Sequence, residues 1–208
     1  MMNRQLTFLI ATSFTLLASA AHAQAAVSAD SGVYQLAPQS RLDVYTGKSG
    51  LFSFVGHKHQ IRARQFSGTI VYFPGDPSRS RLAITVATRG LEVLTPPDTE
   101  EIRKVTESMR GEVMHVDSFP EITFISKQVT PIRGGFRVNG ALTMHGQTRF
   151  VPVDFMVESR VDTLRARATF EVKQTDFGIR PFRGGPGGAV HVADEVKFDI
   201  DAVAVRKP

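Results

Sequence analysis

The histidines are the residues of this chain whose type and spacing could do chemistry. His57 and His59 are separated by one residue, and on a strand residues i and i+2 lie on the same face. Both imidazoles could bind one metal ion if a third ligand joined them, for which His115, His145 and His191 are the candidates. Alternatively, His57 and His59 lie at the mouth of a cavity and contact the head group of a ligand. We favour this second interpretation, because no cysteine and no glutamate-flanked histidine motif supports a metal site.

Sequence signatures of catalysis are absent. The chain has neither a Gly-x-Ser-x-Gly motif nor a dinucleotide-binding fingerprint. Asp194 and Glu195 are adjacent, but neighbouring residues on a strand face opposite ways, so these carboxylates would not converge. The glycine-rich segment 184–188 lacks the Gly-Lys-Ser/Thr signature of a phosphate-binding loop. The sequence therefore predicts a protein that is not an enzyme and uses no cofactor.

The elements that would position these residues are mostly strands. Apolar and polar residues alternate over 66–72, 136–142 and 196–202, and a period of two is typical of a strand with one buried face. A sheet with one apolar face must close on itself or pack on a second sheet. If it closes loosely, its apolar face lines a cavity. We expect strands near 33–36, 41–47, 51–55, 59–73, 81–89, 121–130, 135–145, 149–159, 162–173 and 194–205.

One segment breaks the strand pattern. Pro96 and Pro97 end a strand, and Asp98 stands three residues before Glu101, a spacing typical of a helix start. The charged stretch that follows predicts one short helical insertion at about 98–110, ended by Gly111 and lying across the sheet or over one of its ends. A second irregular segment, 175–193, is predicted to be a long loop.

The first 23 residues read as a secretory signal peptide. Arg4 supplies the positive charge, an apolar run follows, and Ala21-His22-Ala23 is a small-x-small cleavage site. The chain has no cysteine, so the sequence predicts neither disulfides nor a lipoprotein anchor. We expect a protein exported to the periplasm, with a flexible mature N-terminus over 24–32 and one domain over 33–206.

The charge of the chain is only mildly basic. The 25 Lys and Arg residues exceed the 20 Asp and Glu residues by five, and loss of Arg4 with the leader lowers the net charge to +4. Arginines alternate along two strands, at 62 and 64 and at 165 and 167, which predicts a solvated outer face or, alternatively, a surface for acidic lipid head groups. Nucleic acid is not an expected partner, because no basic motif is interleaved with aromatic residues.

Phenylalanine dominates the aromatic residues. The chain has 15 Phe, 3 Tyr and no Trp, and many of the Phe residues take the apolar parity of their strand. Two interpretations stay open: these rings either fill a tight core or line a tunnel.

Four motifs, in this order and spacing, resemble the YceI-like, polyisoprenoid-binding family of exported proteins. They are VDSFPEITF at 116–124, GALTMHGQT at 140–148, QTDFGI at 174–179 and ADEV at 193–196. The resemblance implies an all-β fold: an extended antiparallel eight-stranded barrel, similar in outline to a lipocalin. It also implies an elongated pocket for an amphiphile with a prenyl or fatty-acyl chain. Family members resemble carriers or stores, and they are often dimers.

The sequence and the resemblance together predict a carrier for a long apolar ligand, with transient contact with a membrane surface and a homodimer as further expectations. His57 and His59 are expected to contact the head group. Strand parity alone selects the residues expected to line the pocket around the tail, which are Phe66, Ile70, Phe124, Phe136, Val138, Leu142, Phe155, Leu164 and Phe170. Two rival functions remain, a periplasmic metal-binding protein that uses a His-x-His site and a non-catalytic stress or interaction protein with a solid core.

Overall fold

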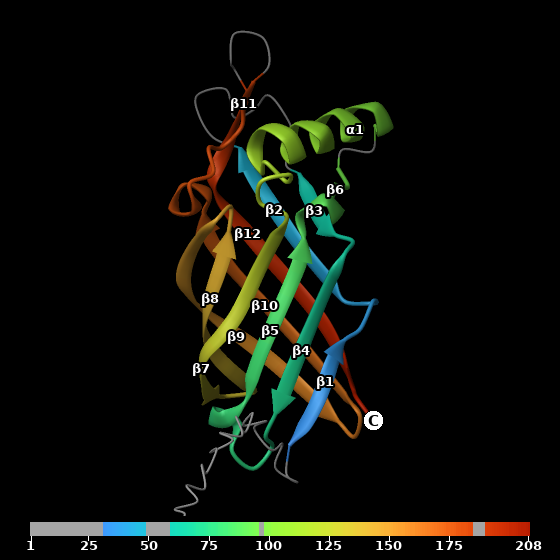
Figure 1. The fold of residues 1–208 in the computed structure, drawn as a ribbon, viewed down its shortest axis with the longest axis vertical. Helices are drawn as coiled ribbons and strands as arrows, with labels where there is room; N and C mark the ends of the chain where they lie inside the picture. The colour runs from blue at the N-terminus through green and yellow to red at the C-terminus, as the bar shows by residue number, and fades with distance from the viewer. Residues whose placement is uncertain (1–30, 49–58, 96–97, 185–189) are drawn as a thin grey trace, which may run out of the picture.

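Strands dominate the computed structural model, which describes residues 31–48, 59–95, 98–184 and 190–208 (Figure 1). The strands are β1 (Gly32–Leu36), β2 (Arg41–Lys48), β3 (Gln60–Ala63), β4 (Phe66–Tyr72), β5 (Arg81–Ala87), β6 (Leu91–Val93), β7 (Glu121–Ile132), β8 (Gly135–Met144), β9 (Gln147–Arg160), β10 (Thr163–Lys173), β11 (Arg183–Gly184) and β12 (Val190–Arg206). The helical elements are η1 (Pro77–Arg79), η2 (Thr88–Gly90), α1 (Thr99–Ser108), the π-helix η3 (Met109–Val113) and η4 (Gln174–Phe177).

Eight of the strands form a closed antiparallel ring. Their order is β1-β4-β5-β7-β8-β9-β10-β12, and β1 pairs with β12 to complete the ring. The alternation in the sequence explains this closure, because a closed sheet buries one continuous apolar face and leaves no long unpaired edge. The predicted all-β, lipocalin-like barrel of eight antiparallel strands is therefore confirmed, and the ribbon shows that it is elongated along its strands (Figure 1).

The upper part of the wall, as drawn in Figure 1, is built from a second set of strands. The 17-residue strand β12 pairs with β1 at Leu36↔Ala204 and further along with β2 at Leu42↔Ile200. The order then continues through β3 to β6, so these strands extend the wall beyond β1, β4 and β5.

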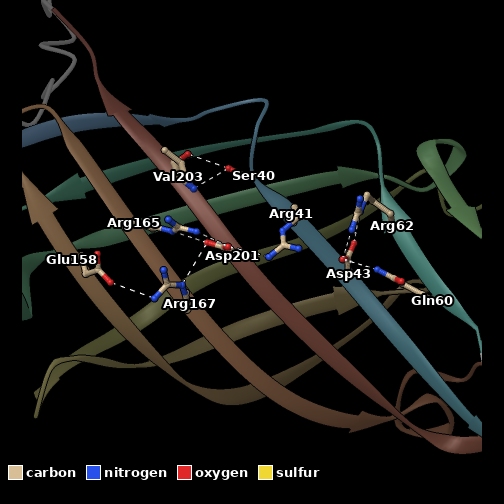
Figure 2. Close-up of polar contacts among 10 residues, drawn as sticks. All are labelled: Ser40, Arg41, Asp43, Gln60, Arg62, Glu158, Arg165, Arg167, Asp201 and Val203. Atoms are coloured by element: carbon tan, nitrogen blue, oxygen red, sulfur yellow. Dashed lines mark hydrogen bonds and ion pairs between the residues drawn. The ribbon is translucent and has the colours of Figure 1, made fainter. Parts of the chain in front are cut away.

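A serine side chain bridges the place where the chain leaves β1 and enters β2. The Ser40 hydroxyl donates a hydrogen bond to the Val203 carbonyl at 3.1 Å and accepts one from the Val203 amide at 3.0 Å (Figure 2). The Val203 carbonyl also accepts a bond from the Ala37 amide at 2.7 Å, so the serine hydroxyl replaces the backbone partner of the Val203 amide alone.

One predicted strand, 59–73, is two strands in the structure. The chain breaks at Arg64 and Gln65, where β3 ends and β4 begins, and β5 and β6 break at the same level through η2. The Arg64 amide donates to the Gly90 carbonyl at 2.8 Å, and the Ala87 amide donates to the Gln65 carbonyl at 3.0 Å. The inward side chains change from odd positions on β3, such as Ile61 and Ala63, to even positions on β4, such as Ile70. The prediction of one continuous strand was therefore wrong about the break although right about the type of structure.

The helix α1 covers the free edge of β6. Strand β7 begins only at Glu121 and pairs with β5, so in the described part of the chain no strand adjoins β6 on that side. Instead the Thr106 hydroxyl accepts a hydrogen bond from the Val93 amide at 3.3 Å, and the Arg110 guanidinium donates to the Leu91 carbonyl at 3.0 and 2.7 Å. The helix lies across the upper end of the barrel (Figure 1).

The helix begins where the sequence predicts, but it does not end there. The Asp98 carboxylate accepts a hydrogen bond from the Glu101 amide at 2.8 Å, which makes Asp98 the N-cap. Gly111 was expected to end the helix, yet the chain continues through Gly111 in η3 as far as Val113. The bonds from Arg110 to the edge of β6 hold this extra turn in place, and the sequence pattern does not contain them.

Two carboxylates, one buried and one half-buried, organise the outer face of the wall (Figure 2). Asp43 is only 4% exposed and accepts two hydrogen bonds of 2.7 Å from Arg62 and one of 3.0 Å from Gln60. Burial raises the pKa of Asp43, but the hydrogen bonds from Arg62 and Gln60 outweigh it and hold the pKa below its usual value. This cluster joins β2 to β3.

The second carboxylate, Asp201, binds three guanidinium groups. Arg165 contacts it at 2.9 and 2.8 Å, Arg41 at 3.1 Å and Arg167 at 3.8 Å. Arg167 also pairs with Glu158 at 3.3 Å. The alternating arginines therefore lie on the outer face as predicted, but they are paired with carboxylates.

Of three further predictions, one was wrong in part and two concern residues that the structure does not describe. The predicted loop 175–193 was wrong in part, because it contains most of η4, strand β11 and the first residues of β12. The signal peptide lies outside the described residues, as does the strand predicted at 51–55. Within the described ranges no helix is both long and apolar enough to span a membrane.

The arginine cluster predicts an acid-sensitive contribution to stability. Hydrogen bonds from Arg165 and Arg41 lower the pKa of Asp201 from 3.8 to about 2, so the folded state favours the carboxylate. This stabilisation is present above pH 3.8 and is lost as the pH falls through about 2. We expect Asp201→Asn to reduce the free energy of unfolding by about 1–2 kcal/mol at neutral pH, measured by urea denaturation. A deficit that stays constant down to the lowest pH would contradict the assignment.

Candidate functional site: an interior chamber

The barrel is hollow at the end that α1 covers. A chamber of about 410 Å³, called here the upper chamber, lies between α1 and the walls formed by β2, β3, β6 and β12. Strand parity points the apolar side chains of the wall inward, and the volume falls in the range of small-molecule sites. The wall residues are Val44, Thr46, His59, Ile61, Leu91, Val93, Ile122, Met144, His191, Val192, Val196 and Phe198.

One face of α1 and the start of η3 complete the upper chamber. The lining residues of the helix recur at helical spacing, so they share one side of it. They are Glu101, Lys104, Val105, Ser108 and Met109, followed by Val113 and Met114 in the turn beyond. Gln174, Ile179 and Phe182 contribute from the segment around η4.

Methionine is concentrated around this chamber. Met109, Met114 and Met144 all line it, which is half of the six methionines in the sequence. The thioether side chain is unbranched and polarisable, so it adapts to ligands of different shape. The lining therefore suits an apolar group without a rigid outline.

The floor of the upper chamber is formed by aromatic and aliphatic side chains. Phe198 lines both the upper chamber and a cavity of about 90 Å³ below it, called here the middle cavity. Its ring stacks on Phe170, with the ring centroids 4.7 Å apart and the planes at 7°. A third hollow of about 90 Å³, the lower cavity, shares Ile84, Phe155 and Ile200 with the middle one. The interior is thus a series of hollows along the barrel.

Most residues predicted to bind the tail surround the two smaller cavities. Phe124, Leu142 and Phe170 line the middle cavity, and Phe155 lines both the middle and the lower cavities. The lower cavity is also lined by Ile70, Phe136, Val138 and Leu164. Phe66 is half-buried and packs against the core without lining any of the three hollows. All nine side chains point inward, and a role in ligand binding remains a prediction for each.

Of the two histidines predicted at the head group, the structure describes one. His59 lines the upper chamber, and its Nδ1 atom lies 2.8 Å from the Thr95 carbonyl oxygen. His57 lies outside the described residues. Within the described ranges no group of three or more His, Cys, Asp or Glu side chains could hold a metal ion, so the rival metal site gains no support there.

Sequence reasoning missed most of the upper chamber. Val44, Ile61 and Val93 have inward parity but lie on short strands that the Phe pattern does not mark. The signal that could have found the chamber is the apolar face of the predicted helix, where Val105 and Met109 are spaced four residues apart. An insertion with one apolar face must cover something apolar.

A strained histidine pair lies beside the chamber. His115 and His145 both have positive φ angles, of 44° and 51°, and their ring centroids lie 5.5 Å apart. Among the described residues the Nε2 atom of His145 is buried without a hydrogen-bond partner. Burial lowers the pKa of His145 from 6.5 and the neighbouring His115 lowers it further, while a hydrogen bond with the Phe177 backbone offsets part of this.

Together, the fold and the chamber define an antiparallel β-barrel with an apolar interior site. The YceI-like domain model matches residues 34–204, and the chain belongs to this family. The predicted family is therefore confirmed. No curated protein matches the chain.

Solved structures share the fold at low sequence identity. BcnA from Burkholderia cenocepacia is 18% identical with a TM-score of 0.64, over 80% of this chain and 96% of that one. A polyisoprenoid-binding domain from Saccharophagus degradans, implicated in plant cell wall breakdown, is 13% identical with a TM-score of 0.60, over 84% and 98%. The YceI protein of Campylobacter jejuni is 14% identical with a TM-score of 0.55, over 71% and 84%.

The histidine pair predicts a loss of stability in weak acid. Because the lowered pKa of His145 disfavours its protonation in the folded state, its contribution is present above pH 6.5 and is lost as the pH falls below that value. We expect the melting temperature to fall between neutral pH and about pH 5, and to fall less in His145→Asn, since Asn tolerates a positive φ. Equal losses in both proteins would contradict this role.

The aromatic floor predicts a limit on tail length. Phe198→Ala removes the ring shared by the upper chamber and the middle cavity, so longer tails should gain affinity relative to shorter ones. The free energy of unfolding should fall by about 3 kcal/mol, because a large core side chain is lost. Binding of a chain-length series by calorimetry measures the preference. Phe170→Ala, which opens only the middle cavity, is the matched control, and an unchanged preference in Phe198→Ala would exclude this role.

Proposed function

We propose that this protein is an exported carrier or store for a long-chain amphiphile whose tail lies in the upper chamber. The single observation that carries the proposal is the apolar chamber of about 410 Å³ between α1 and the wall. A barrel that only needed stability would fill this space, because a cavity loses packing contacts.

The tail provides the affinity in this proposal. Burying apolar chain contributes about 0.8 kcal/mol per methylene, before the entropic cost of ordering the chain and of association. A neutral hydrogen bond to the head group contributes about 1 kcal/mol. Affinity is therefore set mainly by how much of the tail the chamber accepts.

The class of tail is proposed from two sources. The neighbour from Saccharophagus degradans is described as a polyisoprenoid-binding domain, and the chain shares its fold. The methionine-rich lining suits a branched isoprenoid or a fatty-acyl chain. The chamber holds only part of a long polyisoprenoid, and the aromatic floor separates it from the two smaller cavities.

Export is proposed from the sequence of the first 23 residues, which has the charge, apolar run and cleavage site of a signal peptide. Binding is proposed in place of catalysis, because the lining groups form no nucleophile and base pair in the described residues. The rival function, a stress or interaction protein with a solid core, is disfavoured by the hollow interior.

Two measurements test the proposal directly. Organic extraction of the purified protein followed by mass spectrometry should recover an amphiphile with a long apolar tail. N-terminal sequencing of the protein from a periplasmic fraction should begin at Gln24. A chain that starts at Met1 in the cytoplasm would overturn the export proposal without affecting the chamber.

A variant that fills the chamber provides a sharper test. Ile61 points into the upper chamber from β3, and Ile61→Trp should occupy the space of the tail and weaken uptake of a fluorescent fatty acid at least about tenfold. The overpacking should cost about 1–3 kcal/mol, which circular dichroism and urea denaturation can measure.

The matched control makes the same change on the outer face. Ile125 on β7 is 46% exposed, so Ile125→Trp should leave uptake unchanged. If a folded Ile61→Trp protein took up the probe as well as the Ile125→Trp control, the upper chamber would not be the binding site.

A further inference from the structure

The helix beside the upper chamber carries more carboxylates than cations. Helix α1 carries three carboxylates, at 100, 101 and 107, against two cations, Arg103 and Lys104. Lys104 pairs with Glu100 at 3.1 Å, and Arg103 pairs with Glu107 at 2.8 Å. Lys104 is the helix cation that lines the chamber, so an anionic head group would meet a cation that already has a carboxylate partner.

Arg110, in the turn that follows α1, also has its guanidinium group hydrogen-bonded within the protein. Arg110 donates two hydrogen bonds to the Leu91 carbonyl, at 3.0 and 2.7 Å, and these bonds satisfy the edge of β6. Turning this side chain toward a phosphate would leave that carbonyl unpaired. Among the described lining residues, Lys104 is the Lys or Arg present, and Glu101 adds a carboxylate to the same lining.

The chamber presents a hydrogen-bond acceptor on His59. The Thr95 carbonyl can only accept, so the Nδ1 atom of His59, 2.8 Å away, must carry the ring proton. In the neutral ring this leaves the Nε2 lone pair as an acceptor. The backbone of His59 is also held in place, because its amide donates to the Thr46 hydroxyl at 3.3 Å.

Gln174 adds a second acceptor. It is 8% exposed and lines the same chamber, and its side-chain amide donates to the Ala193 carbonyl at 2.8 Å. That bond orients the amide, so the side-chain oxygen is left to accept a bond from elsewhere. His59 and Gln174 therefore each offer the chamber a hydrogen-bond acceptor.

We infer that the ligand's head group is an uncharged hydroxyl group, so that the chamber selects a long-chain alcohol over a phosphorylated or carboxylated chain with the same tail. This inference rests on the proposed function. A hydroxyl group donates to the Nε2 atom of His59 and brings no charge that needs a cation. A diphosphate brings several negative charges into an apolar chamber whose one described lining cation, Lys104, is paired with Glu100, so it loses hydration without an equal replacement.

The test compares two probes that share one tail. Farnesol and farnesyl diphosphate have the same fifteen-carbon chain and differ only in the head group. We expect farnesol to displace a bound fluorescent fatty acid at a concentration at least about tenfold lower than farnesyl diphosphate does at neutral pH. Equal or tighter binding of the diphosphate would overturn the hydroxyl inference while leaving the proposed function in place. Failure of both probes to bind would count against the proposed function itself.

Variants separate recognition from structure. His59→Ala should lower the affinity for farnesol about fivefold to tenfold. Farnesene is a hydrocarbon with the same tail and no head group, and the affinity for it should not change. If farnesene weakened as much as farnesol, His59 would only support the wall and the inference would fail. Glu101→Lys should raise the affinity for farnesyl diphosphate and leave the affinity for farnesol unchanged. If neither affinity changed, the electrostatic part of the inference would be wrong.

Discussion

The free edge of β6 is the constraint on which the chamber depends. The Leu91 carbonyl and the Val93 amide lie where the next strand is missing, and buried backbone groups left unpaired cost about 1–3 kcal/mol each. Arg110 and Thr106 satisfy them from the helical segment. A helix is about 10 Å across whereas neighbouring strands lie about 4.8 Å apart, so α1 holds the wall open where a strand would have closed it.

The interior therefore changes character along the barrel. Toward the lower end the strands close the ring completely, and Phe136, Phe155 and Leu164 leave a hollow of about 90 Å³. Under α1 the lining is aliphatic and methionine-rich, and the hollow is about 410 Å³. The closed part is tightly packed, and the part that the helix covers keeps the larger vacant space, where we propose that the ligand binds.

Polar clusters on the outer face support the part of the wall made from short strands. Asp43 links β2 to β3 through Arg62, Asp201 links β12 to its neighbours through Arg41 and Arg165, and the hydroxyl of Ser40 replaces a missing backbone partner (Figure 2). Short strands make few ladder bonds, so side chains that bind across them matter more. The arginines that might have formed a surface for acidic lipids are thereby paired within the wall.

The sequence by itself determined that the fold is built from strands with one apolar face and where the helix begins, because alternation and the Asp98 cap are local signals. That the sheet closes is shown by the pairing of β1 with β12. Only the tertiary structure decided where the interior is empty. Phe124 points inward as its parity requires, but its ring lies over Gly140, where a Cβ would be 2.1 Å from the Cζ atom, and so it fills the middle of the barrel. Parity gives the direction of a side chain. Whether facing side chains meet depends on how far apart the walls stand, and the helix at the edge of β6 sets that distance.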